Sequence, residues 1–140
     1  MKTFKEYLNE NKVKKGSLNP AEARSLFAQA HDRIEDVAHL PLTEKNASFR
    51  FEDAYEALRE VIQAFMAQQG YKPYSHEAII AFAKEEKLLS EREIITLDRY
   101  REIRNDINYQ GERVTILEAQ QIILFATKII NSLTEKMDGK

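Results

Sequence analysis

The sequence predicts an all-α protein built as an up-and-down bundle of four to five main helices. In each of the four long segments, apolar residues recur at intervals of three and four, which is the spacing of one buried helix face. No segment shows sustained strand alternation bounded by turns. The connections between the segments are short, and short connections place successive helices side by side and antiparallel.

Length and composition favour one globular domain. The chain has 140 residues, which is enough for one core and short for two. We therefore expect residues 1–140 to form a single domain, with residues 1–17 as a short N-terminal extension. A composition of 43% hydrophobic and 31% charged residues is typical of soluble globular proteins. The formal net charge of -2 argues against a globally basic nucleic-acid-binding protein, so such binding would need a local basic patch.

Missing residues exclude several classes of site. The chain has no cysteine, which excludes disulfides, thiolate metal sites and cysteine nucleophiles. Its four glycines are too far apart for a phosphate loop or a dinucleotide fingerprint, and no serine occupies a nucleophile elbow, so we expect no cofactor. No apolar run approaches the roughly 20 residues of a membrane span. The N-terminus lacks the apolar centre of a secretory signal, and we expect a cytoplasmic protein without membrane contact.

The first part of the chain predicts a short helix and then a long one. Residues 3–12 are expected to form a short helix with the apolar residues Phe4, Tyr7 and Leu8. Asn19 before Pro20 combines an N-cap residue with proline at the first helical position. This helix should run to about Leu40 and end at Pro41. Its apolar side is expected to comprise Phe27, Ala30, Ile34, Val37 and Ala38.

The middle of the chain predicts a second long helix and a short one. The long helix runs from about Asn46 to Gln69, and Gly70 is placed to end it. Its buried side is expected to comprise Phe51, Ala54, Leu58, Val61, Ile62 and Phe65. Ser75 is the expected N-cap of a short helix from His76 to about Lys87. That helix should bury Ile79, Ile80, Phe82 and Ala83.

Two capping boxes mark the starts of the last two helices. Ser90 with Glu93 opens one, and Thr115 with Glu118 opens the other. Between these helices, Gly111 is the expected hinge of a turn. The last helix should bury Ala119, Ile122, Ile123, Ala126, Ile129, Ile130 and Leu133.

Two groups of residues suggest sites but have simpler interpretations. His31, Glu35 and His39 stand four apart on one helix side, as metal ligands can, but acidic residues surround them and no matching motif follows. We therefore interpret them as a solvated helix face and expect no metal site. Lys72, Tyr74 and His76 can line a secondary ligand cleft at the start of the short helix; the alternative is a turn whose tyrosines pack on the bundle.

The strongest candidate site lies between residues 99 and 113, with the sequence RYREIRNDINYQGER. On a helix at about 100° per residue, one narrow polar face comprises Arg101, Arg104, Asn105 and Asn108. Tyr100, Ile103 and Ile107 form a separate apolar stripe. Arginine offers a planar fork of donors that suits phosphate, so this face favours a phosphate-bearing ligand. The alternative is a set of solvated residues near a helix end, where arginine favours the helix dipole.

Three sequence features together resemble the HEPN family of small all-α domains. They are the helix ending in FMAQQG, the connection YKPYSHEAIIAF and the segment RYREIRNDINYQGE. The resemblance covers roughly Phe51 to Glu118. It implies a helical bundle that often dimerises, with members that are ribonucleases or partners of small nucleotidyltransferases in toxin-antitoxin modules.

The resemblance also assigns roles within the arginine-rich segment. The family's catalytic signature is an arginine, an adjacent polar residue and a histidine a few residues later. Arg104 matches the arginine and Asn105 matches the polar residue, but Tyr109 occupies the histidine position. Tyrosine, with an ordinary pKa near 10, rarely transfers protons at neutral pH, so the substitution favours binding without cleavage. On a regular helix, Arg104 and Tyr109 also point about 140° apart, and would converge only with an unwound helix end or a dimer partner.

The sequence thus leaves three hypotheses. The leading one is a non-catalytic HEPN-like module that contacts RNA, a nucleotide or a nucleotidyltransferase partner through Arg101, Arg104, Asn105, Asn108 and Tyr109. The second is a metal-independent ribonuclease of the toxin type, in which Arg104 and Tyr109 are catalytic. The third is a structural protein that assembles with itself as a homodimer or with another protein.

Overall fold

The computed structural model describes residues 2–138, with the side chains of residues 2–137. In chain order, the elements are α1 (Phe4–Asn9), β1 (Val13–Lys15), α2 (Pro20–His39), α3 (Ala47–Gln68), β2 (Tyr71–Pro73), α4 (His76–Glu85), α5 (Glu91–Gln110) and α6 (Ile116–Asp138). The predicted all-α bundle is confirmed, because the only strands in the described range form a two-stranded ribbon. Among residues 2–138, no helix combines the length and apolarity that crossing a membrane requires.

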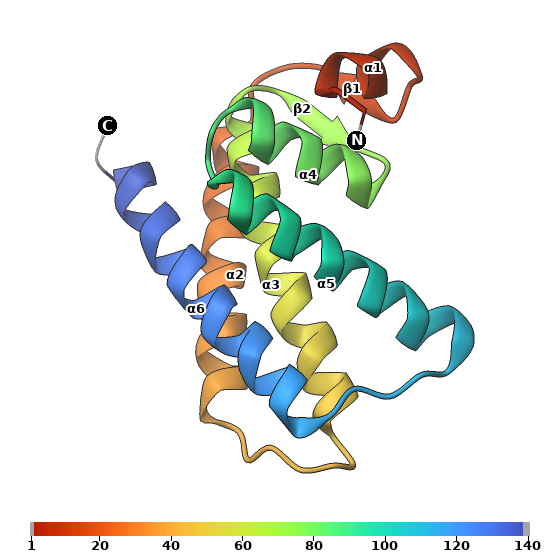
Figure 1. Cartoon of the computed structure of the whole chain (residues 1–140). Coiled ribbons are helices and arrows are strands. Elements are labelled where there is room, and N and C mark those ends of the chain that lie inside the picture. Colours follow the sequence, from red (N-terminus) through yellow and green to blue (C-terminus); the bar gives the residue numbers. More distant parts are fainter. Residues whose placement is uncertain (1, 139–140) are drawn as a thin grey trace.

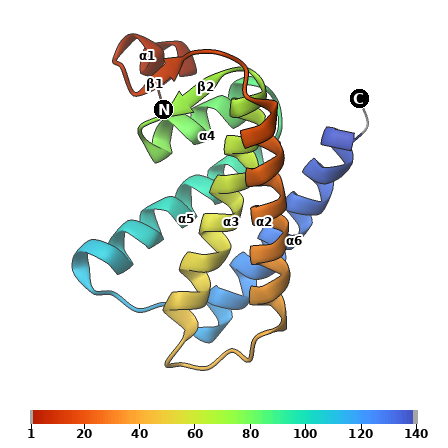
Figure 2. The same cartoon turned by 180° about the vertical axis from the view of Figure 1, so that it is seen from behind.

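α3 is the central helix of the bundle. It contacts the long helices α2, α5 and α6 and the shorter α4. α2, α3 and α6 lie alongside one another, whereas α5 crosses α3 obliquely and α4 lies beside the first half of α5 (Figures 1 and 2). The C-terminal half of α5 therefore extends away from the three-helix core.

Most residues of the predicted buried faces are buried, but Phe27 on α2 and Ile123 on α6 are only half-buried. Every predicted core residue of α3 and α4 is buried, and α3 also buries four alanines that allow close helix approach. Ala38, expected in the buried stripe of α2, is exposed. Its side chain points about 100° away from that of the buried Val37 around the helix axis, and therefore lies outside the face of α2 that packs against α3.

The predicted helix starts are also confirmed. The Asn19 side chain accepts a hydrogen bond from the backbone N–H three residues later, and Ser75 caps α4 in the same way. Both capping boxes are present, with their two reciprocal hydrogen bonds. His76 is thus the first residue of α4. α4 ends at Glu85, two residues earlier than expected, and Lys87 then adopts a left-handed φ of 54°.

The two-stranded ribbon was not predicted. β1 and β2 pair antiparallel with Lys14 opposite Lys72, and each strand has three residues, too few to show an alternating pattern. The ribbon holds the N-terminal segment against α4. There, the ring of Phe4 meets the rings of Tyr71 and Phe82 edge-on, with centroids 5.0 and 5.3 Å away.

Gly70 is required where α3 turns into β2. Its φ is +81°, and a Cβ atom there would lie 2.4 Å from the Gly16 carbonyl oxygen. Gly111 also has a positive φ, +67°, but a Cβ atom added there would have no atom within 4 Å.

Gly70→Ala is expected to lower the free energy of unfolding by about 2 kcal/mol or more, and Gly111→Ala by about 1 kcal/mol. Both substitutions strain a left-handed backbone conformation, but only Gly70→Ala adds a clash with backbone atoms. Urea denaturation of both variants tests this; equal losses would contradict it.

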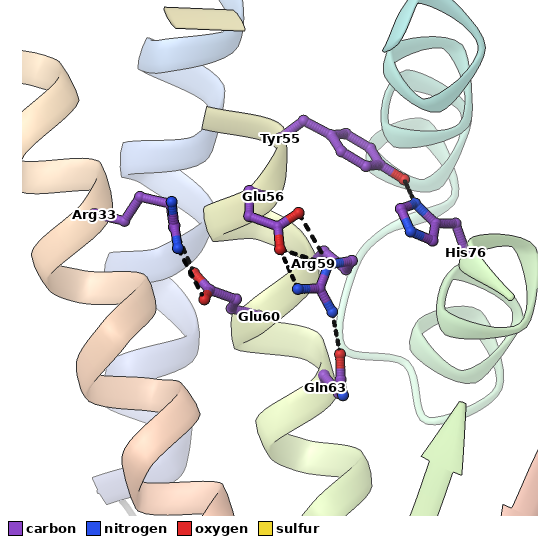
Figure 3. A network of polar contacts seen from close by, with 7 residues as sticks. All are labelled: Arg33, Tyr55, Glu56, Arg59, Glu60, Gln63 and His76. Carbon is purple, nitrogen blue, oxygen red and sulfur yellow. Dashed lines mark hydrogen bonds and ion pairs between the residues drawn. The ribbon is translucent and has the colours of Figure 1, made fainter. Parts of the chain in front are cut away.

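A buried ion pair joins α2 to α3. The carboxylate of Glu60, with 4% of its side chain exposed, accepts hydrogen bonds from Arg33 Nε at 2.8 Å and from the terminal nitrogen Nη2 at 3.3 Å. Figure 3 shows this bidentate contact between the two helices. Both carboxylate oxygens are satisfied, so the charge is tolerated inside the bundle.

Removing Arg33 is expected to destabilise the fold. Arg33→Ala leaves the buried Glu60 carboxylate without its partner, and we expect the free energy of unfolding to fall by about 3 kcal/mol. Arg24→Ala, at an exposed position of the same helix, is the matched control and should change it by less than about 0.5 kcal/mol. Thermal or chemical denaturation measures both. Similar values for the two variants would show that the pair contributes little.

Candidate functional site

A row of polar side chains follows one side of α3. Arg59 Nε donates to both carboxylate oxygens of Glu56 at 3.1 Å, and its terminal nitrogens bond Glu56 and Gln63 (Figure 3). Burial opposes ionisation of Glu56, but the hydrogen bonds and charge of Arg59 outweigh it, so the pKa of Glu56 is lowered. This carboxylate stays charged and holds Arg59 in place.

Tyr55 on α3 meets His76 on α4. The two rings are nearly parallel, at 18°, with centroids 5.9 Å apart, and the tyrosine hydroxyl lies 3.5 Å from His76 Nδ1 (Figure 3). Ser75, the N-cap residue of α4, fixes the start of the helix and so the position of the imidazole. Burial raises the pKa of Tyr55 to about 12, so its hydroxyl keeps its proton at neutral pH.

Arg104 on α5 approaches the same tyrosine. Its guanidinium carbon lies 5.8 Å from the centroid of the Tyr55 ring, within the range of a cation–π contact. The residue is half-buried, and within residues 2–138 it makes neither an ion pair nor a hydrogen bond. Arg59 and Arg101, by contrast, are each held by a carboxylate. The five N–H donors of Arg104 are therefore available to a ligand.

Arg101 on α5 lines a cavity. Its Nε donates to Asp98 at 2.9 Å, and only 15% of its side chain is exposed. The cavity has a volume of about 520 Å³ and lies between α1, α4 and α5. Ser75 and Glu77, the residues on either side of His76, also line it. The residues that line the cavity include the carboxylates of Glu10, Glu77 and Asp98 but not His76 itself.

The positive charges of three arginines, Arg59, Arg101 and Arg104, act on both His76 and Tyr55. We call these five residues the arginine cluster. Burial lowers the pKa of His76, and the positive charges of the three arginines lower it further, with Arg104 the strongest. The negative charge of Glu56 partly opposes them. The same three arginines favour the ionised form of Tyr55, although burial outweighs them. At pH 7 the imidazole is therefore neutral in a region of positive potential.

The structure separates the predicted polar face of α5 into two parts. Arg101 and Arg104 belong to the arginine cluster, and Asn105 is half-buried beside it. Asn108 is exposed, and the Tyr109 side chain is 82% exposed near the end of α5. Within the described residues, no hydrogen bond or ring contact joins Tyr109 to Arg104.

The secondary-cleft residues are also separated. Lys72 and Tyr74 are exposed on β2 and the turn after it, whereas His76 is half-buried against Tyr55. On α2, Nδ1 of His31 lies 3.7 Å from a carboxylate oxygen of Glu35, while Nδ1 of His39 contacts the backbone oxygen of Glu35 at 2.7 Å. Among the residues that the structure describes, no group of three or more histidine, aspartate or glutamate side chains is placed to hold a metal ion.

Sequence reasoning missed Tyr55 and Arg59 as site residues. Both lie on a helix that was interpreted only as core. The available signal was the set of polar residues at helical spacing within an otherwise apolar helix, namely Glu56, Arg59, Glu60 and Gln63.

Comparisons of the chain with protein-family models, with curated proteins and with solved structures give no match. The chemistry of the site therefore rests on its own geometry.

Replacing Arg104 should raise the pKa of His76. Arg104→Gln removes the charge that opposes the imidazolium most strongly, so protonation becomes more favourable. The pH titration of the His76 ring protons by NMR measures this, with His31 and His39 as internal references. Arg113→Gln removes an equal charge from an exposed position after α5 and should leave the pKa of His76 unchanged. An unchanged or lower pKa in Arg104→Gln would show that the two side chains do not interact.

Proposed function

We propose that this chain is a cytoplasmic, HEPN-like, non-catalytic module that binds a phosphate group of RNA or of a nucleotide through the arginine cluster. The observation that carries the proposal is Arg104, a half-buried residue whose guanidinium donors are unused within residues 2–138. An arginine whose donors have no partner within the protein is free to bind an anionic ligand. A phosphate oxygen pair matches the planar fork of its donors.

The surroundings of Arg104 support a nucleotide or RNA ligand. Arg59 and Arg101 add positive potential, although the whole chain has a formal net charge of -2. The cavity beside Arg101, at about 520 Å³, is within the usual size of small-molecule sites. Half-buried Asn105 and exposed Asn108 add amide donors and acceptors on the same side of α5. Tyr109 is exposed but points about 140° away from Arg104 around α5, so its ring is not part of these surroundings.

The same geometry favours binding without cleavage. Phosphodiester cleavage needs one group to take a proton from the nucleophile and another to protonate the leaving group. Among the described residues of the cluster, His76 is the one side chain that changes charge near neutral pH. Tyr55 is 2% exposed and keeps its proton, so it is poorly placed to serve as the second group.

Arg104→Ala should weaken RNA binding. The probe is a ten-nucleotide uridine RNA labelled with tetramethylrhodamine, and fluorescence anisotropy measures its affinity. Loss of a charge-assisted phosphate contact is expected to reduce affinity about tenfold or more. The slope of log affinity against log salt should also become shallower by about 0.7. The control Arg113→Ala, at an exposed position, should change the affinity much less. Equal losses of affinity in the two variants would contradict the proposal, and so would an affinity that does not depend on salt.

A second experiment distinguishes binding from turnover. The purified protein and its Arg104→Ala variant are incubated with mixed RNA, and products are followed over time by gel electrophoresis. We expect no cleavage by either protein. Cleavage that the variant loses would instead identify a metal-independent ribonuclease, with His76 replacing the histidine that α5 lacks.

The homodimer is also part of the proposal. On α6, Leu117 and Leu124 are seven residues apart on one side of the helix, and both are mostly exposed. Exposed leucines at this spacing support contact with a second copy or with a nucleotidyltransferase partner.

A further inference from the structure

The environment of His76 suggests how ligand binding in the arginine cluster is regulated. We infer that binding of a phosphate group is coupled to protonation of His76, so that the site is a proton-linked phosphate receptor whose affinity rises as the pH falls. This inference rests on the proposed function and adds a ligand-contacting group from a different helix. It stands on two contacts of one ring: the half-buried imidazole is stacked on Tyr55 of α3, and the Arg104 guanidinium of α5 approaches the same tyrosine ring at 5.8 Å.

Without ligand, the charges around the imidazole oppose its protonation. Arg59 on α3 and Arg101 and Arg104 on α5 act on it with positive charge. Glu56 is the opposing negative charge, and it is already bonded to Arg59. On its own helix, the neighbouring Glu77 is exposed. Burial adds to the effect of the arginines, so the pKa of His76 lies below its ordinary value near 6.5.

A bound phosphate reverses this balance. Its negative charge, held by Arg104, offsets the arginine charges that disfavour the imidazolium, and the pKa of His76 rises. By linkage, a ligand that raises the pKa of a group binds more tightly when that group is protonated. The affinity for the phosphate group therefore increases as the pH falls through the raised pKa that His76 has in the complex. The increase is complete below the pKa of the free protein.

Tyr55 allows the imidazole to hold either state. Its hydroxyl, 3.5 Å from Nδ1, stays protonated and can donate to neutral His76, which places the ring N–H on Nε2. When His76 is charged, Nδ1–H donates to the tyrosine oxygen instead. Nε2–H remains a donor in both states, and in the charged state its hydrogen bond to a phosphate oxygen is stronger. Tyr55 is thus a positioning residue, because it acts through His76.

The simpler interpretation is that His76 only packs on Tyr55 at the start of α4. That role is served by either protonation state and requires no ligand. It predicts that binding of an anion does not depend on this side chain. The two interpretations therefore differ in a measurable proton uptake.

The experiment measures the affinity of the decauridine RNA at several pH values between 5.5 and 8. This probe is suitable because its phosphodiesters keep one negative charge each throughout this range. The affinity of the unmodified protein for the RNA should be higher at pH 6 than at pH 8 by a factor of about five or more. His76→Gln should lose this pH dependence, because glutamine has no group that gains a proton in this range. The control His31→Gln, at an exposed position of α2, should keep the pH dependence.

Two further measurements protect the test against a folding defect of His76→Gln. Calorimetric titration of the unmodified protein in MES and in imidazole buffer at pH 6.5 should show net proton uptake on RNA binding. The NMR titration of His76 should give a higher pKa with RNA than without it. In Tyr55→Phe, the gain in affinity at low pH should shrink, because the imidazole loses the hydroxyl that positions it.

The outcomes separate the inference from the proposed function. Binding that depends on Arg104 but shows no proton uptake, or a pH dependence that His76→Gln retains, would overturn the inference and leave the proposed function intact. If the unmodified protein fails to bind the RNA at every pH, the proposed function fails and the inference fails with it.

Discussion

The burial of α3 on most of its sides is the constraint on which both the fold and the site depend. A polar side chain on such a helix must find a partner inside the protein, because an unsatisfied buried group is costly. Glu60 meets Arg33 from α2, Glu56 meets Arg59 within α3, and Tyr55 meets the histidine at the start of α4. Figure 3 shows these contacts following one helix. The polar side of the site is thus part of how the central helix is accommodated.

The path of α5 explains why Arg104 is available. The residues of α5 that are buried, Ile94, Leu97 and Tyr100, lie in its first half. Beyond Tyr100 the helix extends obliquely from the core, as Figure 1 shows, so its next turns are only half-covered. Arg104 stands at this boundary, near enough to reach the Tyr55 ring and only half-buried. A ligand that enters at this edge meets a guanidinium already held over an aromatic ring.

Local sequence signals predicted the helices, whereas partners between helices needed the folded structure. Asn19 with Pro20 and the two capping boxes are complete within a few residues, so their chemistry is readable from the chain. The ribbon of β1 and β2 pairs residues 56 to 60 positions apart, and its strands of three residues are too short for a periodic signal. Ala38 was misplaced because a helical wheel gives the direction of a side chain but not the width of the neighbouring helix.

The site divides in the same way. Arg101 and Arg104 share a helix face that is visible in the sequence, but the wheel cannot show which other helices that face meets. Tyr55, Arg59 and His76 come together with them only because α3, α4 and α5 pack against one another. Conversely, Asn108 and Tyr109 are close to Arg104 in sequence but lie where α5 has left the core. Contacts from other helices therefore define this site better than neighbours along α5.

The charge balance of the arginine cluster limits the kind of ligand that fits it. Arg59 and Arg101 are already paired with carboxylates, so within the described residues Arg104 is the arginine of the cluster that can take on a phosphate without losing another partner. A site with so few available cations cannot neutralise a long run of phosphates, and its counterion release is correspondingly small. Affinity must therefore come from contacts other than charge neutralisation. This favours a nucleotide or a short single strand over a nucleic-acid duplex.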